Sequence, residues 1–222
     1  PMLLPTEALR KMLAALKDID HLNYVRIGSR APVVFPTRFF DDELIELLAE
    51  FNRHKPLYVP THFNHPREIT PVAREAIARL RNAGVTVNNQ AVLLRGVNDD
   101  VDTLTELMDG LLQAGVNPYY LYQCDLAEGL SHFRTPIGKG IEIMESLIGH
   151  TSGFAVPQYV IDAPGGGGKI PLQPESMVGR EGDDLLLAGP LHRLGQSRRP
   201  VFRIGDDLLA ALGAMLAALG GA

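Results

Sequence analysis

The chain has 222 residues, 45% of them hydrophobic, and a formal net charge of −5 at pH 7. This composition is that of a globular protein rather than a disordered one, and its acidic balance argues against a nucleic-acid-binding function, which usually needs a basic excess. The single cysteine, Cys124, excludes a disulfide within the chain, so we expect a reducing, cytoplasmic setting. One cysteine also cannot hold an iron–sulfur cluster or a structural zinc ion unaided, so no metal ligands are predicted here.

Helical and extended patterns alternate along residues 7–161. Apolar spacing and capping residues predict helices over residues 7–17, 42–52, 71–82, 101–114 and 138–148. Short apolar runs between them predict strands over residues 21–27, 56–60, 85–94, 117–123 and 154–161. One strand–helix unit takes about 30 residues, as a βαβ crossover requires. The alternation therefore indicates an α/β fold with a parallel sheet covered by helices.

Five such units suit part of a (β/α) barrel better than a complete one, because eight units need about 250 residues. The alternative is an open doubly wound sheet, but no glycine-rich dinucleotide fingerprint follows the first strand. We predict a partial barrel over residues 1–173 and a small C-terminal appendage over residues 174–222. Within the appendage we expect an irregular or hairpin segment over residues 177–203. An apolar helix over residues 208–219 would then pack on another subunit or on the rest of the fold, since a membrane span takes about 20 residues.

Polar segments accompany the five predicted strands. They are residues 28–30, 61–65, 88–90, 122–125 and 162–169. Reactive residues of a parallel barrel lie at the carboxyl ends of its strands, so we expect these segments to share one rim. Their shared position indicates a site more strongly than any one segment does.

Lys169 follows four glycines at positions 165–168. Glycines allow positive φ and a close approach of the backbone to a ligand, including a phosphate group. The nucleotide P-loop pattern does not fit, because Ala163 stands where a glycine is needed and Ile170 where Ser or Thr is needed. A lysine on such a loop instead suits a Schiff base with a carbonyl cofactor such as pyridoxal phosphate. From the residues alone, the alternative is a flexible loop with a solvent-facing lysine.

The other polar residues of the rim each allow a structural and a functional interpretation. His62 and His65 could bind a metal, but no third ligand is near in sequence, so a hydrogen-bonding role is the alternative. Asp125 and Asp162 end two neighbouring strands, where they would attract a cationic group, cap helices or pair with arginines. Gln90 would contact a ligand or satisfy backbone groups.

Six blocks occur in order and without large gaps, at residues 26–34, 61–66, 89–99, 119–126, 132–136 and 162–169. Together they resemble the lysine 2,3-aminomutase family, and the resemblance covers about residues 5–175. It implies a radical-type isomerase on a six-unit barrel, which moves the α-amino group of L-lysine to C3 and gives L-β-lysine. It also implies three cofactors: S-adenosylmethionine, a [4Fe–4S] cluster and pyridoxal phosphate.

The resemblance assigns roles to particular residues. It implies that Lys169 forms the Schiff base with pyridoxal phosphate, and that Asp125 and Asp162 hold the distal ammonium of the substrate. Tyr122 lies where the family has a residue that lines the cofactor pocket.

The two contacts to S-adenosylmethionine that the resemblance implies are His62 and Gln90. The substrate would be a small amino acid. The complete enzyme would be a homo-oligomer that acts without nucleic acid or membrane.

The sequence also departs from the family. The Cys-x3-Cys-x2-Cys motif that holds the cluster is absent, as are the Gly-Gly-Asp contact and the arginines expected upstream of Pro1. These departures predict a C-terminal fragment that is inactive alone, with the cluster ligands outside this chain. Asp100 stands where some members have a zinc-binding cysteine, so no zinc site is expected.

Several alternatives remain within and outside this class. A related aminomutase would act on arginine or another amino acid, although the two aspartates disfavour glutamate. The intact glycine run disfavours the branch that handles a lysine of a translation factor. A non-catalytic cofactor-binding remnant is supported by the missing cysteines.

Overall fold

The computed structural model describes residues 1–163, 168–175, 177–181, 184–188 and 201–204. In chain order the helices are α1 (Thr6–Lys17), α2 (Ala31–Val34), α3 (Asp42–His54), α4 (Pro71–Asn82), α5 (Val101–Ala114) and α6 (Ile137–Leu147). The strands of the larger sheet are β1 (Val25–Arg26), β2 (Leu57–Thr61), β3 (Thr86–Leu93), β4 (Asn117–Gln123), β5 (Gln158–Asp162) and β6 (Lys169–Pro171). Short 3-10 helices lie in the connections: η1 (Pro36–Phe40), η2 (Pro66–Glu68), η3 (Ser131–Phe133) and η4 (Gly153–Ala155).

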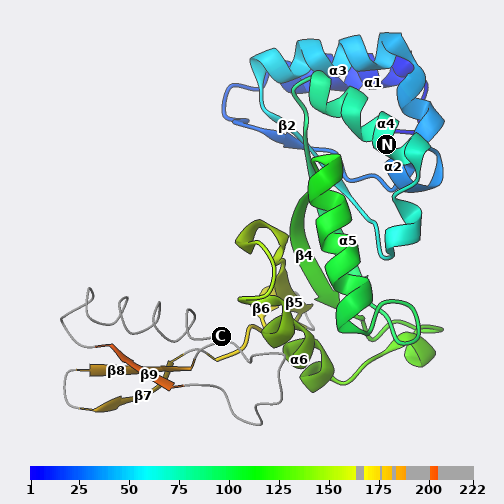
Figure 1. The fold of residues 1–222 in the computed structure, drawn as a ribbon. Helices are drawn as coiled ribbons and strands as arrows, with labels where there is room; N and C mark the ends of the chain where they lie inside the picture. Colours follow the sequence, from blue (N-terminus) through cyan, green and yellow to red (C-terminus); the bar gives the residue numbers. More distant parts are fainter. Residues whose placement is uncertain (164–167, 176, 182–183, 189–200, 205–222) are drawn as a thin grey trace.

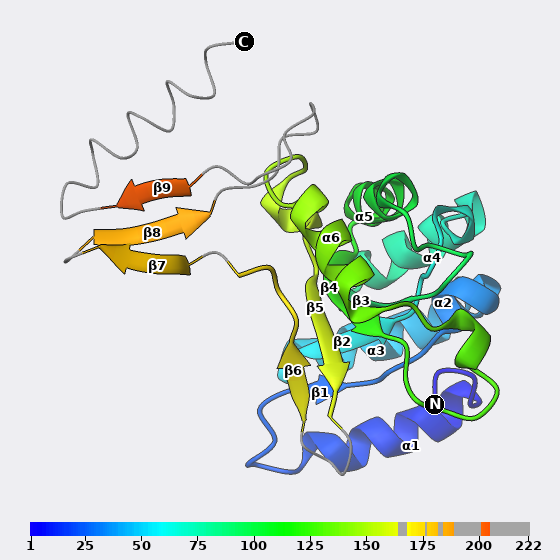
Figure 2. The ribbon, with the colours of Figure 1, turned by 90° about the horizontal axis from the view of Figure 1, so that it is seen from below.

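The six strands form one curled sheet in the order β1-β2-β3-β4-β5-β6 (Figure 1). β1 to β5 run parallel, which confirms the predicted parallel sheet, whereas β6 runs antiparallel to β5 and is not predicted by the sequence. α3, α4, α5 and α6 pack against β2, β3, β4 and β5 respectively, so helices cover one face of the sheet (Figure 2). The predicted α/β class is confirmed, and the sheet is that of a half-barrel.

Helix boundaries follow local capping chemistry. The side chains of Thr70 and Asp100 accept the backbone N–H groups of Ala73 at 3.1 Å and Thr103 at 2.8 Å, and so begin α4 and α5. α5 ends at Gly115, whose φ of +76° is the left-handed conformation that glycine adopts readily. Each helix in the described part of the chain is too short or too polar to span a membrane.

Buried and partly exposed side chains alternate along the strands. Buried residues such as Val59, Val87 and Leu121 face the covering helices and belong to the hydrophobic core. The opposite face of the sheet is called the inner face here. Its partly or fully exposed residues include Arg26, Tyr58, Asn88, Gln90, Tyr120, Tyr122 and Asp162.

Some predicted elements differ from the observed ones. The strand predicted over 21–27 contains only Val25 and Arg26, which pair with β2 at the edge of the sheet. The strand predicted over 154–161 divides into η4 and β5. The predicted hairpin segment is a three-stranded antiparallel sheet of β7 (Met177–Glu181), β8 (Asp184–Ala188) and β9 (Val201–Ile204). The predicted helix over 208–219 lies outside the described residues, and the division of the chain at residue 173 stays a prediction.

A close approach between α6 and β5 makes Gly140 important for stability. A Cβ at Gly140 would lie 2.2 Å from Tyr159 Cζ. The Tyr159 ring is fully buried and its hydroxyl donates to Gln123 Oε1, so the ring has little room to move. We expect Gly140→Ala to lower the free energy of unfolding by about 1–3 kcal/mol through overpacking, despite the roughly 1 kcal/mol by which alanine favours a helix.

Gly138 provides the matched control in the same helix, because a Cβ there would meet nothing within 4 Å. Gly138→Ala, in the first turn of α6, is expected to leave the free energy of unfolding unchanged or to raise it by up to about 1 kcal/mol. Urea unfolding of the three proteins measures the difference. Equal midpoints for Gly138→Ala and Gly140→Ala would contradict a tight contact between Gly140 and Tyr159.

Candidate functional site

Four of the predicted site residues form a continuous series of contacts on the inner face. Gln90 Nε2 donates to Tyr122 Oη at 3.4 Å, and Lys169 Nζ lies 4.9 Å from the centre of the Tyr122 ring. Lys169 Nζ also donates to Asp162 Oδ1 at 2.7 Å. These residues come from β3, β4, β6 and β5, so the strand order of the sheet is what brings them together.

Lys169 and Asp162 face each other across the antiparallel pair of β5 and β6. The sequence predicts Lys169 on a glycine-rich loop, and this is wrong because Lys169 is the first residue of β6. Gly168 has a φ of +81°, which favours glycine, while positions 165–167 lie outside the described residues. The two side chains are 38% and 43% exposed, and such surface pairs contribute only about 0–1 kcal/mol to stability. A ligand can therefore displace either partner at little cost.

The charges of this contact series affect one another. The hydrogen bond to Asp162 raises the pKa of Lys169, while partial burial opposes this effect. Burial raises the pKa of Tyr122, and the nearby Lys169 ammonium opposes that shift. At neutral pH Lys169 is thus a charged ammonium and Tyr122 a neutral phenol. Because only a neutral amine attacks a carbonyl, Asp162 both orients Lys169 and restrains its reactivity.

His62 is partly buried, and its surroundings favour the neutral form of the imidazole. Burial lowers the pKa of His62, and the Arg30 guanidinium lowers it further. Glu68 and a hydrogen bond with Asn64 oppose this shift. The imidazole is therefore neutral near pH 7 and can both donate and accept a hydrogen bond.

His62 directly follows β2 and lies at the level of Gln90 in the neighbouring strand β3. Thr61 pairs with Asn89 in the parallel register of β2 and β3, and His62 and Gln90 are the residues that follow. The sequence predicts Gln90 at the carboxyl end of its strand, and this is wrong because β3 continues to Leu93. Gln90 reaches the site from within the sheet rather than from a loop.

Asp125 lies two residues beyond the end of β4 and is exposed. The Arg134 guanidinium donates to the backbone oxygens of Asp125 at 3.2 Å and Ala127 at 3.1 Å, and so holds this loop. Asp162 ends the neighbouring strand β5, but its carboxylate is bonded to Lys169. The two aspartates predicted as a pair thus come from neighbouring strands and have different immediate surroundings.

His65 has a structural environment. Its Nδ1 accepts the backbone N–H of Arg67 at 3.1 Å, and Glu68 completes a capping box at the start of η2. Among the described residues, no three His, Cys, Asp or Glu side chains gather as metal ligands would. The hydrogen-bonding alternative for His65 is therefore the one that fits the structure.

Sequence reasoning gave no role to three asparagines that hold the segment carrying His62, although Asn64 and Asn89 lie within the predicted polar segments 61–65 and 88–90. Asn64, Asn89 and Asn98 are 8%, 1% and 0% exposed, and their side chains bond backbone groups near the ends of β2 and β3. Each asparagine interrupts an apolar or structured segment, which is the signal that could have identified it. Arg134 was also given no role, because its guanidinium bonds backbone oxygens nine and seven positions away, and backbone acceptors leave no sequence pattern.

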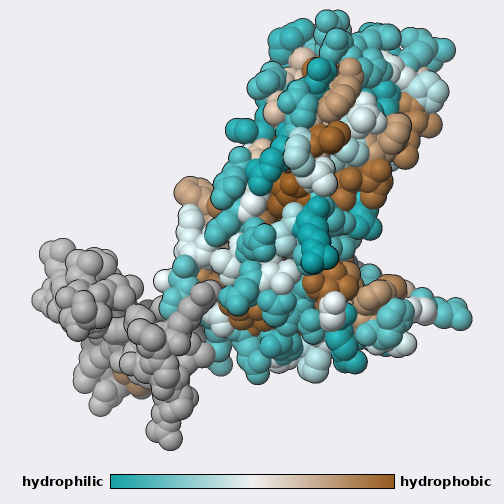
Figure 3. Space-filling model, turned by 45° about the vertical axis from the view of Figure 1, so that its right-hand side comes forward, coloured by the Kyte–Doolittle hydropathy of each residue, from teal (hydrophilic) through white to brown (hydrophobic). Residues whose placement is uncertain are grey.

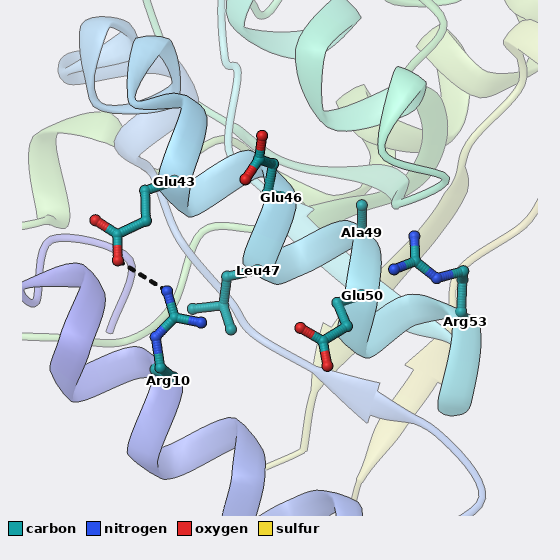
Figure 4. Close-up of a pocket in the computed structure, with 7 residues that line it drawn as sticks. All are labelled: Arg10, Glu43, Glu46, Leu47, Ala49, Glu50 and Arg53. Atoms are coloured by element: carbon teal, nitrogen blue, oxygen red, sulfur yellow. Dashed lines mark hydrogen bonds and ion pairs between the residues drawn. The ribbon is translucent and has the colours of Figure 1, made fainter.

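A groove elsewhere on the molecule lies between α1 and α3 (Figure 4). Arg10 pairs with Glu43 across it at 2.8 Å, and both side chains are exposed. The groove contains none of the six predicted site residues. Its lining residues are Arg10, Glu43, Glu46, Leu47, Ala49, Glu50 and Arg53. Exposed ion pairs of this kind are typical of solvated helix surfaces.

Hydrophobic surface forms separate patches on the face shown in Figure 3. Leu3, Leu4, Val34 and Phe35, from the amino-terminal segment and the region of α2, are 45–62% exposed. Three of them, Leu3, Leu4 and Val34, line a hollow that also includes residues 28–30. Residues 28–30 were predicted as part of the polar rim, yet they border a largely apolar hollow.

Comparison with known proteins gives a consistent family likeness. A family model described as lysine-2,3-aminomutase matches residues 144–189. The chain is 50% identical over 186 residues to L-lysine 2,3-aminomutase of Clostridium subterminale, which covers 84% of this chain and 44% of that protein. The enzyme of the same name from Bacillus subtilis is 50% identical over 186 residues, or 84% of this chain and 39% of that protein.

A relative that is named for a different substrate is also similar. Glutamate 2,3-aminomutase of Clostridioides difficile is 45% identical over 184 residues, which covers 83% of this chain and 43% of that protein. The chain thus spans less than half the length of these curated relatives.

Proposed function

This chain belongs to the lysine 2,3-aminomutase family, and from that premise we propose that it supplies the cofactor-binding lysine and the substrate-binding carboxylates of an enzyme that converts L-lysine into L-β-lysine. The observation that carries the proposal is the position of Lys169 Nζ, 2.7 Å from Asp162 Oδ1 and 4.9 Å from the centre of the Tyr122 ring. A primary amine, a carboxylate and an aromatic ring are there combined on the inner face.

The residues around Lys169 fit pyridoxal phosphate. The amine projects from the first residue of a strand, so its position is defined, and it is accessible to a carbonyl compound. Tyr122 offers an aromatic surface for a pyridine ring, and Gln90 fixes the Tyr122 hydroxyl. When bound, pyridoxal phosphate would make the substrate amino group part of a conjugated system, and so would allow it to migrate between carbons.

His62 and Gln90 fit S-adenosylmethionine as hydrogen-bonding partners. A neutral imidazole directly after β2 and an uncharged amide in the adjacent strand β3 suit the polar edges of a nucleoside without requiring a charge. The described residues do not fit an iron–sulfur cluster, because Cys124 is buried and no cysteine joins it.

Asp125 and Asp162 would bind the cationic end of the substrate. One carboxylate at the end of β5 and another two residues beyond the end of the neighbouring strand β4 offer strong acceptors for an ammonium group. They would repel the side-chain carboxylate of glutamate, and this favours lysine over the substrate named for the relative from Clostridioides difficile. Asp162 would first have to exchange its Lys169 partner for the substrate ammonium, which the small energy of an exposed pair permits.

Product analysis tests this proposal. The full-length protein that contains this sequence would be incubated anaerobically with both organic cofactors, a reductant and L-lysine or L-glutamate. We expect β-lysine from L-lysine and no more than trace conversion of glutamate. Conversion of glutamate in preference to lysine would overturn the substrate assignment, and absence of product from both would overturn the proposed activity.

Asp162→Asn is expected to shift the pH dependence of cofactor capture. Asp162 raises the pKa of Lys169, so loss of its charge lowers that pKa and leaves more neutral amine at a given pH. Borohydride-trapped pyridoxal phosphate should then form faster, and its pH profile should move to lower pH. Asp20→Asn, an exposed substitution away from the site, should leave the profile unchanged. A profile that moves to higher pH in Asp162→Asn would contradict the contact.

A further inference from the structure

The ladder between β2 and β3 continues beyond its last backbone pair by means of side chains. Thr61 and Asn89 are the final register partners of the two strands. After them, Asn89 Oδ1 accepts the backbone N–H of Phe63 at 2.7 Å, and Asn89 Nδ2 donates to the Phe63 carbonyl at 3.0 Å. One side-chain amide thus replaces the peptide group that a longer strand would supply.

Two further asparagines extend this arrangement. Asn64 Oδ1 accepts the backbone N–H of Val92 at 2.9 Å. Asn98 Nδ2 donates to the carbonyls of Asn64 and Val92, both at 2.8 Å, and Asn98 Oδ1 accepts the Leu94 N–H at 2.7 Å. The segment after β2, strand β3 and the loop after β3 are therefore joined through Asn64, Asn89 and Asn98, which together are called the asparagine clamp here.

The asparagine clamp is buried and its bonds have no substitute nearby. Asn98 is 0% exposed and Asn89 is 1% exposed, so removal of either amide leaves buried backbone groups without partners. Glu68 Oε2 accepts the backbone N–H groups of Asn64 and His65, which fixes the far side of the same segment. The backbone on the carboxyl side of His62 is held at successive residues.

The asparagine clamp lies directly beside two residues of the candidate site, His62 and Gln90. His62 directly precedes Phe63, which Asn89 holds, and Gln90 directly follows Asn89. The alternation of the strands turns Asn89 toward the core and leaves Gln90 partly exposed on the inner face. A shift of the clamp would therefore change the separation of His62 and Gln90 without removing either side chain.

We propose that the asparagine clamp fixes His62 relative to Gln90, and that Asn64 and Asn98 are positioning residues for the nucleoside part of S-adenosylmethionine. This inference rests on the proposed function, in which His62 and Gln90 contact that cofactor. The clamp acts through the backbone of residues 62–64 and through the hydrogen bond between Asn64 and His62, rather than through a proposed contact with the cofactor or the substrate.

Substitutions within the clamp test this role. Asn64→Ala and Asn98→Ala are expected to weaken binding of S-adenosylmethionine about tenfold, because a misplaced contact group loses much of its interaction. Isothermal titration with S-adenosylmethionine measures the affinity. The histidine resonances, assigned with His62→Gln, report the pKa of His62. In Asn98→Ala this pKa should rise toward its ordinary value as the segment becomes more solvated, whereas Asn64→Ala also removes a hydrogen bond that raises the pKa, so the two effects oppose each other in that variant.

Asn117→Ala is the matched control. Asn117 Nδ2 donates to Asn88 Oδ1 at 3.0 Å, so this variant also removes a hydrogen bond between amide side chains of β3 and β4. This hydrogen bond lies at an exposed position away from His62. Neither the affinity nor the pKa of His62 should change in it. If a variant fails to fold, hydrogen exchange of the Phe63 and Val92 amides is measured in the parent protein instead. Protection of these amides equal to that of the β2–β3 ladder supports the clamp, and fast exchange overturns it.

The outcomes separate the inference from the proposed function. If His62→Gln does not alter S-adenosylmethionine binding, the proposed contact is wrong. If His62→Gln weakens binding but folded Asn64→Ala and Asn98→Ala variants bind normally with an unchanged His62 pKa, the positioning role alone is wrong. If the parent protein does not bind S-adenosylmethionine, the proposed function fails, while the His62 pKa and the hydrogen exchange still decide whether the clamp fixes this segment.

Discussion

Lys169→Ala is expected to abolish covalent binding of pyridoxal phosphate and to reduce β-lysine formation on the order of 10³-fold or more, because no other group could form the Schiff base at this position. The amine of Lys169 is accessible on the inner face, whereas Lys55 Nζ is bonded to the backbone oxygens of Ile19 and Leu22. Visible absorbance after addition of pyridoxal phosphate measures the covalent adduct, and product analysis measures turnover.

Two further variants separate the loss of the reactive amine of Lys169 from the loss of its positive charge. Lys169→Arg keeps a cation beside Asp162 but has no amine that can condense with a carbonyl, so it should be as inactive as alanine. Lys11→Ala removes an exposed lysine of α1 and should behave as the parent protein does. Retention of the absorbance in Lys169→Ala, or its loss in Lys11→Ala, would contradict the assignment of Lys169.

Asp125→Asn and Asp162→Asn are each expected to weaken the binding of L-lysine by roughly 10- to 100-fold, since a hydrogen bond to a charged group contributes about 1.5–3 kcal/mol. Each variant keeps the shape of the side chain and removes one negative charge. Titration of the full-length protein with L-lysine measures the loss. Asp20→Asn, exposed and distant in sequence from both aspartates, is the control and should leave affinity unchanged.

A second ligand makes this prediction specific. L-Norleucine has no distal ammonium, so its affinity should be nearly the same in the parent protein and in both aspartate variants. Equal losses for lysine and norleucine would indicate a general disturbance of the site. Unchanged lysine affinity in both variants would remove the assignment of these carboxylates.

Local signals allowed some elements to be predicted with the observed boundaries. α5 spans Val101–Ala114, between the Asp100 cap and Gly115, and β4 spans Asn117–Gln123, both as predicted. β6 could not be predicted, because a strand of three residues has no periodicity of its own and exists through pairing with β5. β1 is shorter than its apolar pattern because pairing at the sheet edge, rather than propensity, decides its length.

The candidate site, too, has features that the sequence could predict and features that it could not. The sequence placed Asp162 near the end of a strand, and the parallel order of the sheet gathers the residues that follow the strands. The contacts that join Gln90, Tyr122 and Lys169 depend on the register of three strand pairs, which no local pattern encodes. The asparagine clamp also depends on long-range pairing, since Asn98 bonds Asn64 from 34 positions away.

The most direct test of the central claim is to map the site at which pyridoxal phosphate is fixed by borohydride. Reduction at Lys169 would block tryptic cleavage there, so the label should appear in a single peptide of residues 140–180. We expect this peptide to carry the phosphopyridoxyl group and the peptide ending at unmodified Lys169 to disappear. Label on another lysine, such as Lys55 or Lys139, with Lys169 still cleaved by trypsin, would contradict it.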